Sequence, residues 1–404
     1  MAAHFVISRW LTRGVVAAFL VATVAAGPLC STARAQSFTP LTTFGSNGWL
    51  APDSIPQLDN SNSQRGIGVS PLTGNVILVD RDSTLGNNAY VLNGTTGAVS
   101  GTLAPPAGGY SGGTFVVSLA GVGADGAVYV ANLATSAAAA FRVYRWASDS
   151  DFVTPATVAF SGTFTGGAPR YGDSFAVFGS GTAAKFAAAG SNDATANRNS
   201  YFAVGSLSGT ASQTSSAFVQ VVNSQTTTAG NNGYRLGLSF MSGTSLLGTQ
   251  GTQLYSTTFD STVTSNIVST STTSWAAADR PLAYLSHNGT PYVATVNTNS
   301  STVSLFDITD PTLPAFKASG NATVGTPNGN LNGAGAVGWG PYLGNDQYLL
   351  YALNSNNGIQ AFTVTVPEPS TWALLATAAG VGGMTVLRNR PSSRRRRRSS
   401  GVGI

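Results

Sequence analysis

The sequence predicts an all-β protein whose main body is a β-propeller of about six blades. Between residues 36 and 366, Gly, Ser, Thr, Asn, Ala and Val dominate while Lys and Glu are scarce, which favours strands and turns over surface helices. Loosely similar units begin near residues 66, 116, 173, 234, 282 and 335, close to the length of a four-stranded blade. The chain is 42% hydrophobic and 9% charged, so it can bury a substantial core rather than stay disordered.

Each unit consists of short apolar segments separated by Asx-Gly or Pro-containing turns. The expected strands cover 66–69, 75–80 and 89–92; 116–120, 127–132 and 141–146; 174–178, 183–188 and 201–205; 234–240, 245–249 and 253–259; 282–286, 291–296 and 303–308; and 335–340, 348–353 and 358–364. Residues 41–50 are expected to add a strand that closes the ring against the last unit. A pair of β-sandwiches is the main alternative and a β-solenoid the third, but the repeat period favours the propeller.

Two local resemblances point the same way. Residues 303–311 (VSLFDITDP) resemble a line of propeller repeats found in bacterial surface proteins. Residues 66–80, with 127–132 and 143–146, resemble an uncharacterised bacterial β-propeller-like domain. The resemblance implies a propeller over residues 36–365, and neither family implies an activity.

The first 35 residues have the three parts of a secretory signal peptide. Two arginines precede an uncharged apolar stretch at 14–27, and Ala33 and Ala35 place the expected cleavage before Gln36. The apolar stretch is shorter than the roughly 20 residues that a spanning helix needs, so an uncleaved anchor is the weaker alternative. The sequence therefore predicts that the chain from Gln36 onward is exported.

The C-terminal segment, residues 366–404, opens with Val366, Pro367, Glu368 and Pro369, and Glu368 is the only glutamate of the chain. A membrane helix is expected at 372–387, followed over 388–398 by an arginine-rich cytoplasmic end. The arginines of this end are Arg388, Arg390, Arg394, Arg395, Arg396, Arg397 and Arg398.

The order of motif, helix and arginines closely resembles the PEP-CTERM sorting signal. The resemblance implies recognition by an exosortase, a membrane-embedded cysteine transpeptidase, in a Gram-negative-type bacterium that makes exopolysaccharide. The helix is short and contains three glycines, which suits a segment that is recognised and then cut. A plain tail anchor with a proline-rich hinge is the alternative.

The net charge of +5 for the whole chain comes from arginines in its two terminal segments, not from residues 36–366. Three arginines precede residue 36 and seven follow residue 387, so ten basic residues face fourteen aspartates between them, a net charge of about −4. A mildly acidic body gives no electrostatic basis for binding nucleic acid.

Few residues point to catalysis. Cys30 is the only cysteine and lies within the expected signal peptide, which excludes disulfides, thiol nucleophiles and Cys-ligated zinc in the processed chain. The one histidine after residue 36, His287, stands beside an Asn-Gly turn and is expected to be exposed there. We therefore predict no catalytic residues and no cofactor.

Two pairs of aspartates are weak candidates for calcium, because carboxylate oxygens are the ligands that this ion prefers. Asp80 and Asp82 flank an arginine at a strand end that could face the top of the propeller, and Asp149 and Asp151 form the second pair. Neither pair has the spacing of an EF-hand loop.

These observations predict an exported surface or extracellular-matrix protein, structural or adhesive within an exopolysaccharide layer. Its expected partners are the secretion machinery, an exosortase and exopolysaccharide. The inner membrane is expected to hold it only in transit to the outer envelope or matrix. The alternatives are a secreted propeller hydrolase or lyase that acts on polysaccharide, and a calcium-dependent carbohydrate-binding module.

Overall fold

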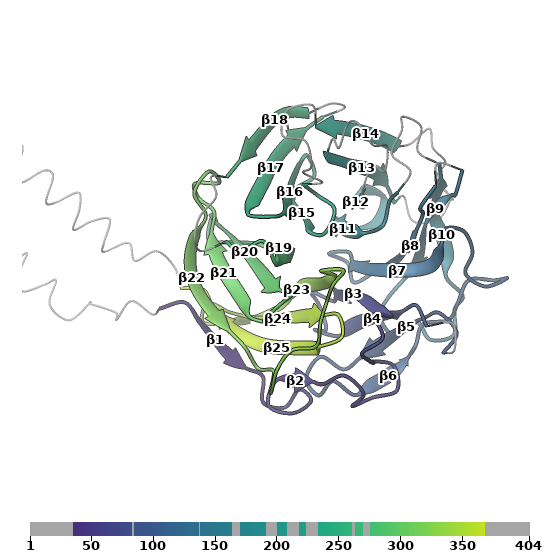
Figure 1. Cartoon of the computed structure of the whole chain (residues 1–404). Coiled ribbons are helices and arrows are strands. Elements are labelled where there is room, and N and C mark those ends of the chain that lie inside the picture. Colours follow the sequence, from purple (N-terminus) through teal and green to yellow (C-terminus); the bar gives the residue numbers. More distant parts are fainter. Residues whose placement is uncertain are drawn as a thin grey trace, which may run out of the picture. The chain divides into compact units, whose positions relative to one another are not determined.

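The computed structural model describes residues 35–82, 85–136, 138–163, 170–190, 200–207, 218–223, 233–260, 263–269 and 275–367. Six antiparallel sheets make up the compact unit Gln36–Val366, and they are arranged as the blades of a β-propeller, which confirms the predicted fold (Figure 1). Ala33, Glu368, Pro369, the expected helix at 372–387 and the arginines of 388–398 lie outside the described residues. Within the described ranges, no helix is long and apolar enough to cross a membrane.

The first three blades follow one another along the chain, each in strand order from the channel outward. Blade 1 consists of β3 (Gln64–Val69), β4 (Val76–Asp80), β5 (Asn88–Leu92) and β6 (Val99–Thr102). Blade 2 consists of β7 (Phe115–Val122), β8 (Val128–Leu133), β9 (Phe141–Trp146) and β10 (Thr157–Gly162). Blade 3 consists of β11 (Ser174–Phe178), β12 (Lys185–Ala189), β13 (Ser200–Ser206) and β14 (Phe218–Asn223), with a short 3-10 helix, η1 (Gly181–Ala183).

The last three blades complete the ring. Blade 4 consists of β15 (Leu238–Ser242), β16 (Ser245–Gln250), β17 (Gln253–Phe259) and β18 (Val263–Val268). Blade 5 consists of β19 (Asp279–His287), β20 (Thr290–Asn297), β21 (Val303–Asp307) and β22 (Ala315–Gly320). Blade 6 combines β23 (Gly335–Gly344), β24 (Gln347–Asn354) and β25 (Gly358–Thr365) with β1 (Ser37–Pro40) and β2 (Trp49–Leu50), which both pair with β25.

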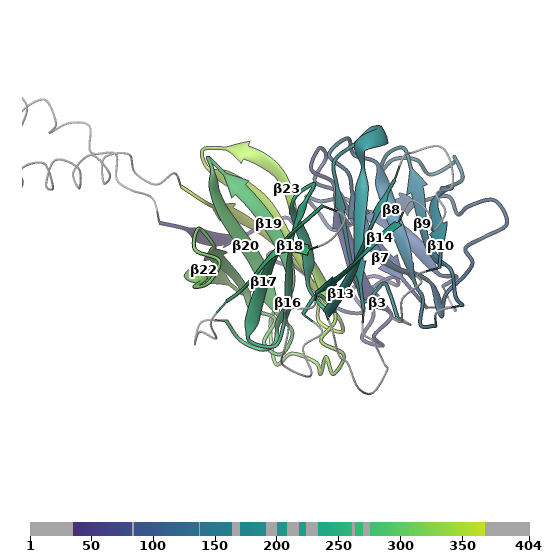
Figure 2. The ribbon, with the colours of Figure 1, turned by 90° about the horizontal axis from the view of Figure 1, so that it is seen from above.

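The core lies between neighbouring blades, because both faces of a blade are covered by its neighbours (Figure 2). Ile77 and Val91 of blade 1, for example, pack in one cluster with Val128 and Val130 of blade 2. Every residue of β4 and β8 is buried, whereas most of β6, at the outer edge of its blade, is exposed. This explains the continuous apolar runs of the middle strands, since a strand covered on both faces needs no polar alternation.

The N-terminal strand closes the ring. Strand β1 forms the outer edge of blade 6, where Phe38 meets Phe362 edge to face with ring centroids 5.4 Å apart. The strand expected at 41–50 contributes only its last two residues, which pair with β25 as β2. A closing segment was therefore predicted near the right place, but the longer of the two closing strands lies four residues earlier than the start of the expected one.

The chain enters and leaves the propeller at neighbouring positions on blade 6. Ser37 pairs with Thr365, so the chain enters beside the point at which it leaves. Val366, the first residue of the expected sorting motif, is fully buried in the core of blades 5 and 6 and its backbone N–H donates to the carbonyl of Asp346 at 2.7 Å. The propeller thus includes Val366, and Pro367 is the last described residue of the motif.

Candidate functional site at the arginine end of the channel

The channel at the centre of the ring is lined by the first strands of the six blades, β3, β7, β11, β15, β19 and β23. Its cavity measures about 170 Å³. Glycines on these strands let the blades approach closely: a Cβ on Gly121 would lie 2.7 Å from Val177, and one on Gly338 would lie 2.5 Å from Val69. The wall therefore consists mostly of backbone and apolar side chains, and Asp173 is the one charged residue among the described residues that line it.

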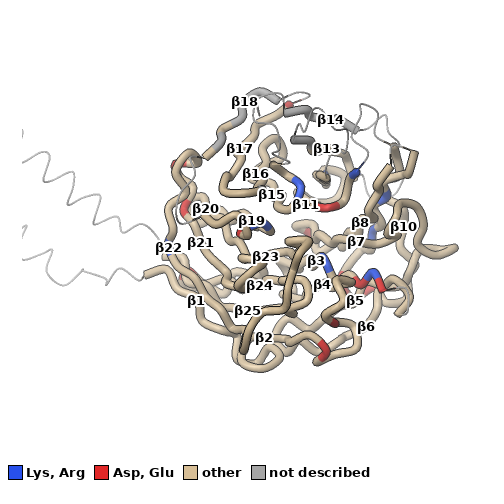
Figure 3. Tube along the Cα trace, in the orientation of Figure 1, with Lys and Arg blue, Asp and Glu red and all other residues tan. Residues whose placement is uncertain are grey.

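Five arginines lie at one end of the blades, which we call the arginine end. Figure 3, which looks along the ring, shows basic positions near its centre. Four of them stand on or just before a first strand, because the first strand of each blade starts at this end: Arg65 on β3, Arg170 before β11, Arg235 before β15 and Arg280 on β19. The fifth, Arg81, follows β4, whose last residue pairs with the start of β3. Four different blades thus contribute cations to one end of the channel.

Asp173 is the carboxylate at the centre of this cluster. Arg170 donates to it through Nε to Oδ2 at 2.5 Å and through Nη2 to Oδ1 at 2.7 Å, and Arg235 donates through Nε to Oδ2 at 3.2 Å. The side chain of Asp173 is only 4% exposed, so these are largely desolvated, charge-assisted bonds. One carboxylate therefore serves two guanidinium groups.

Arg65 and Arg81 have weaker partners. Both donate to the backbone carbonyl of Asn62, Arg65 through Nε at 3.4 Å and Arg81 through Nη2 at 3.3 Å. Arg81 is 9% exposed and its guanidinium carbon lies 3.8 Å from the ring centroid of Phe115. Among the described residues, the buried Nε and Nη1 of Arg81 have no hydrogen-bond partner.

The environment disfavours the positive charge of these two arginines. Burial lowers the pKa of Arg81 to about 9, and the neighbouring charge of Arg65 acts in the same direction. Burial also lowers the pKa of Arg65, with the attraction of Asp173 opposing that effect and the repulsion of Arg170 and Arg235 adding to it. Burial therefore makes the charged form of both guanidinium groups less favourable here than in water.

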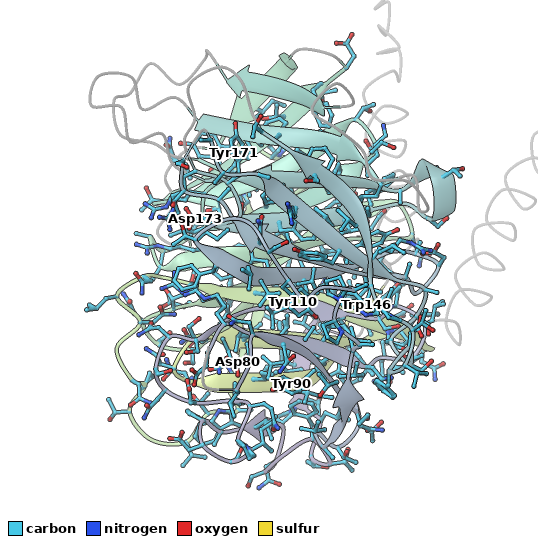
Figure 4. The ribbon with its side chains drawn as sticks, turned by 90° about the vertical axis from the view of Figure 1, so that its right-hand side faces the viewer. Asp80, Tyr90, Tyr110, Trp146, Tyr171 and Asp173 are labelled. Carbon is cyan, nitrogen blue, oxygen red and sulfur yellow. The ribbon has the colours of Figure 1, made fainter. Side chains whose placement is uncertain are left out.

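Asp80 is a buried acid at the same end; Figure 4 shows it and Asp173 toward one side of the blades. Its Oδ1 accepts hydrogen bonds from Gln64 Nε2 at 3.0 Å and from the backbone N–H of Asp82 at 2.9 Å. Its Oδ2 is buried without a hydrogen-bond partner among the described residues. Burial raises the pKa of Asp80 to about 6, so this carboxyl group takes up a proton near neutral pH.

Asn62, whose carbonyl accepts from Arg65 and Arg81, is held in place by hydrogen bonds to Asn356. The backbone N–H of Asn62 donates to Asn356 Oδ1 at 2.7 Å, and Asn356 Nδ2 donates back to Asn62 Oδ1 at 3.1 Å. Ser355 Oγ donates to the carbonyl of Gln64 at 2.8 Å. Asn356 has a φ of +70°, a conformation that asparagine adopts more readily than most residues. The turn that follows β24 thus holds the backbone oxygen to which Arg65 and Arg81 bind.

The second predicted pair of calcium ligands lies elsewhere. Asp149 is buried and accepts hydrogen bonds from Thr73 Oγ1 and from Asn75 Nδ2, the latter at 3.2 Å, so it joins blade 2 to the β3–β4 turn of blade 1. Asp151 accepts from the backbone N–H of Thr154 at 3.3 Å. Among the described residues, no three His, Cys, Asp or Glu side chains gather so that they could hold a metal ion.

The prediction that His287 is exposed was wrong. It stands at the end of β19, beside the expected turn, but it is only 4% exposed. Its Nδ1 lies 3.0 Å from the hydroxyl of Tyr348 and its Nε2 3.2 Å from Oδ1 of Asp346. The β23–β24 hairpin of blade 6 supplies both partners and covers the ring, so His287 has a structural environment at the end opposite to the arginines.

The arginine end itself was missed, because the sequence was assessed through a net charge over the whole body. A positional signal was present: Arg65, Arg170, Arg235 and Arg280 all lie within three residues of the start of a repeat unit. Equivalent positions in a propeller meet at one end of the channel, so aligning the units by position would have indicated a cationic cluster. Arg81 carried no such signal.

No family model matches the chain, and no curated protein matches it. Among solved structures it is similar to a DUF4623 family protein from Bacteroides eggerthii, at 15% identity and a TM-score of 0.53, over 76% of this chain and 72% of that one. It is also similar, at a TM-score of 0.38 and 10% identity over 78% of this chain and 90% of that one, to a GH43_1 enzyme from Xanthomonas citri. The first likeness supports the fold alone, and the second is too distant to carry an argument. Fold and site together define a six-bladed β-propeller with a cluster of arginines and aspartates at one end of its channel.

Proposed function

We propose that this protein is an exported, cell-surface β-propeller that binds extracellular polysaccharide at the arginine end of its channel. The observation that carries the proposal is Arg81, a nearly buried arginine whose Nε and Nη1 have no hydrogen-bond partner among the described residues. Leaving a buried polar group unpaired costs about 1 to 3 kcal/mol, so these two N–H groups require a partner, which a bound ligand or an ordered water molecule would supply. The role would be adhesive or structural within an exopolysaccharide layer.

The placement of the two chain ends supports an attached protein. The chain enters and leaves the propeller side by side at Ser37 and Thr365, and the arginines lie at the opposite end of the first strands. A propeller held through residue 366 would keep its binding end away from the point of attachment. The sequence of the signal peptide and of the sorting motif supports export and exosortase recognition.

The sorting part is tested with Glu368→Ala, and Ser370→Ala is the matched control. We expect both variants to be exported, and we expect Glu368→Ala alone to retain the C-terminal segment, as measured by mass spectrometry of the surface protein. An intact C-terminal segment on the mature wild-type protein would contradict exosortase processing.

The binding part is tested by co-sedimentation of the full chain with exopolysaccharide purified from a bacterium that carries this gene. We expect Arg65→Gln to weaken binding. Lys317→Gln should not, because Lys317 lies on the outer strand of blade 5, where it pairs with Asp307 at 3.2 Å. Equal binding by both variants would place the ligand elsewhere.

A second candidate function is a secreted propeller enzyme that cleaves polysaccharide. One observation favours it: Asp80 has a pKa raised to about 6 by burial, as a general acid requires, and Asp173 lies at the same end as a second carboxylate. Incubation with acidic and neutral polysaccharides, followed by measurement of new reducing ends or unsaturated products, tests this candidate. Turnover that is lost in Asp80→Asn would support the enzyme over the adhesive protein.

A further inference from the structure

The chain leaves the propeller at the end of the channel opposite to the arginine end, which we call the hairpin end. This end is formed by the turns that follow the first strands, among them the turn between β23 and β24. The backbone N–H of Val366 donates to the carbonyl of Asp346 in that turn at 2.7 Å. We propose that, while the protein is held by its C-terminal segment, the hairpin end lies against the lipid surface with Tyr342 and Leu343 in the interface. This inference rests on the export and sorting part of the proposed function, and it names the surface of the propeller that contacts lipid.

The short connection to the expected membrane helix places the hairpin end near the membrane. Val366 is fully buried in the core of blades 5 and 6, so the propeller fixes the chain up to that residue. Residues 367–371 are all that separates it from the helix expected at 372–387. A stretch of this length spans at most about 18 Å when fully extended, and the headgroup region takes up about 5 to 8 Å of that distance. The turn to which Val366 is bonded must therefore stay close to the headgroups.

Exposed apolar side chains lie on both sides of this exit point. On blade 6, Tyr342 is 53% exposed and Leu343 is 49% exposed, both near the end of β23. On blade 5, Leu313 is 57% exposed in the turn before β22, and Phe316 is 49% exposed at the start of that strand. Strand β22 lies beside β1, which pairs with β25, so the two sets flank the exit. Tyrosine is enriched at membrane interfaces, and phenylalanine and leucine bury readily there.

The described charges beside the exit do not favour an anionic lipid. Asp346 is bonded to the buried ring of His287 and Asp307 pairs with Lys317, each at 3.2 Å. Asp310, in the turn before β22, is exposed. Anionic lipids attract clusters of Lys and Arg, and these aspartates provide the opposite charge. A neutral lipid surface, bound through apolar side chains, is therefore the partner that this end fits.

The test is quenching of a fluorescent label by nitroxide lipids in phosphatidylcholine vesicles. The chain is exported in a host without exosortase, so that the C-terminal segment is retained, and Cys30→Ser removes the only cysteine. Leu343→Cys then carries the label, and Leu331→Cys, in the fully exposed loop between β22 and β23 at the arginine end, is the matched control. We expect quenching at position 343 to exceed that at 331 at least about threefold, because the eight residues of β24 separate the two ends by about 26 Å.

A second arm tests the side chains themselves, with the label at Leu313→Cys. Tyr342→Ser combined with Leu343→Ser should cause a loss of quenching at position 313, whereas Leu331→Ser should leave it unchanged. If Tyr342→Ser does not fold, because its hydroxyl accepts from the N–H of Asp346 at 3.2 Å, Leu343→Ser alone decides the matter.

The outcomes separate this inference from the proposed function. Equal quenching at positions 343 and 331, or no effect of the serine substitutions in the hairpin, would overturn the lipid contact while export and sorting stand. A chain that does not float with the vesicles would overturn the expected membrane helix and the lipid contact together.

Discussion

Replacing Asp80 by asparagine should stabilise this protein above pH 6 and leave its stability almost unchanged near pH 4. The carboxyl group of Asp80 is fully buried, and burial raises its pKa from 3.8 to about 6. Asparagine has the same shape and keeps an oxygen to accept from Gln64 Nε2 and the N–H of Asp82. The substitution removes the buried charge, and its Nδ2 takes the place of Oδ2, which has no hydrogen-bond partner among the described residues.

The sign and size of this change in stability follow from the linkage between proton binding and folding. Between pH 3.8 and about 6 the folded protein binds a proton that the unfolded chain releases, so the free energy of unfolding falls as the pH rises through this window. A shift of this size corresponds to about 3 kcal/mol of destabilisation once both states are ionised. An amide accepts weaker hydrogen bonds than a carboxylate, and its NH2 group finds no partner at this buried position, which together remove about 1 to 2 kcal/mol of the gain. We expect Asp80→Asn to gain about 1 to 2 kcal/mol at pH 7.5.

Urea denaturation of wild type and Asp80→Asn at pH 4 and pH 7.5 measures this difference. Asp53→Asn, which removes a carboxylate from an exposed turn, is the control, and its effect should stay within about 0.5 kcal/mol at both values. A loss of stability in Asp80→Asn at pH 7.5, or a gain of equal size at both pH values, would show that the buried carboxyl group does not behave as its environment indicates.

Three further substitutions probe the closure, the polar core and the arginine end. Phe38→Ala should lower the free energy of unfolding by about 2 kcal/mol in urea because it removes the edge-to-face contact that closes blade 6, whereas exposed Thr39→Ala should cost less than about 0.5 kcal/mol. Asn354→Ala should lower the free energy of unfolding by about 2 to 4 kcal/mol in the same assay, because it leaves three buried hydrogen-bonding groups without their partner. These groups are Asn330 Nδ2, Ser301 Oγ and the carbonyl of Thr298. An unchanged urea midpoint would mean that they find other partners. Gly333→Ala should weaken exopolysaccharide binding in the co-sedimentation assay with a stability loss of only about 1 kcal/mol, because the new Cβ would displace Nη1 of Arg280 and the residue has a φ of +58°. Wild-type binding would show that Arg280 does not contribute to the site.

The sequence by itself was sufficient to predict the all-β class, the number of blades and most of the strands. Strand and turn preferences act over a few residues, and the repeat units record one blade each. Continuous apolar runs such as β4 and β8 were therefore located closely without knowledge of their neighbours. The signal peptide and the sorting segment are likewise local patterns, and they remain predictions from the sequence.

Only the tertiary structure decided which residues meet at the two ends of the channel. Arg65 and Arg235 are 170 positions apart in the sequence, and they approach one another because each lies near the start of the first strand of its blade. His287 looked like a turn residue until the hairpin of another blade covered it, and β1 closes the ring through a partner more than 300 residues away. Contacts of this kind depend on how blades pack, which no local pattern encodes. The arginine end is therefore a property of the ring, although each of its arginines is visible in the chain.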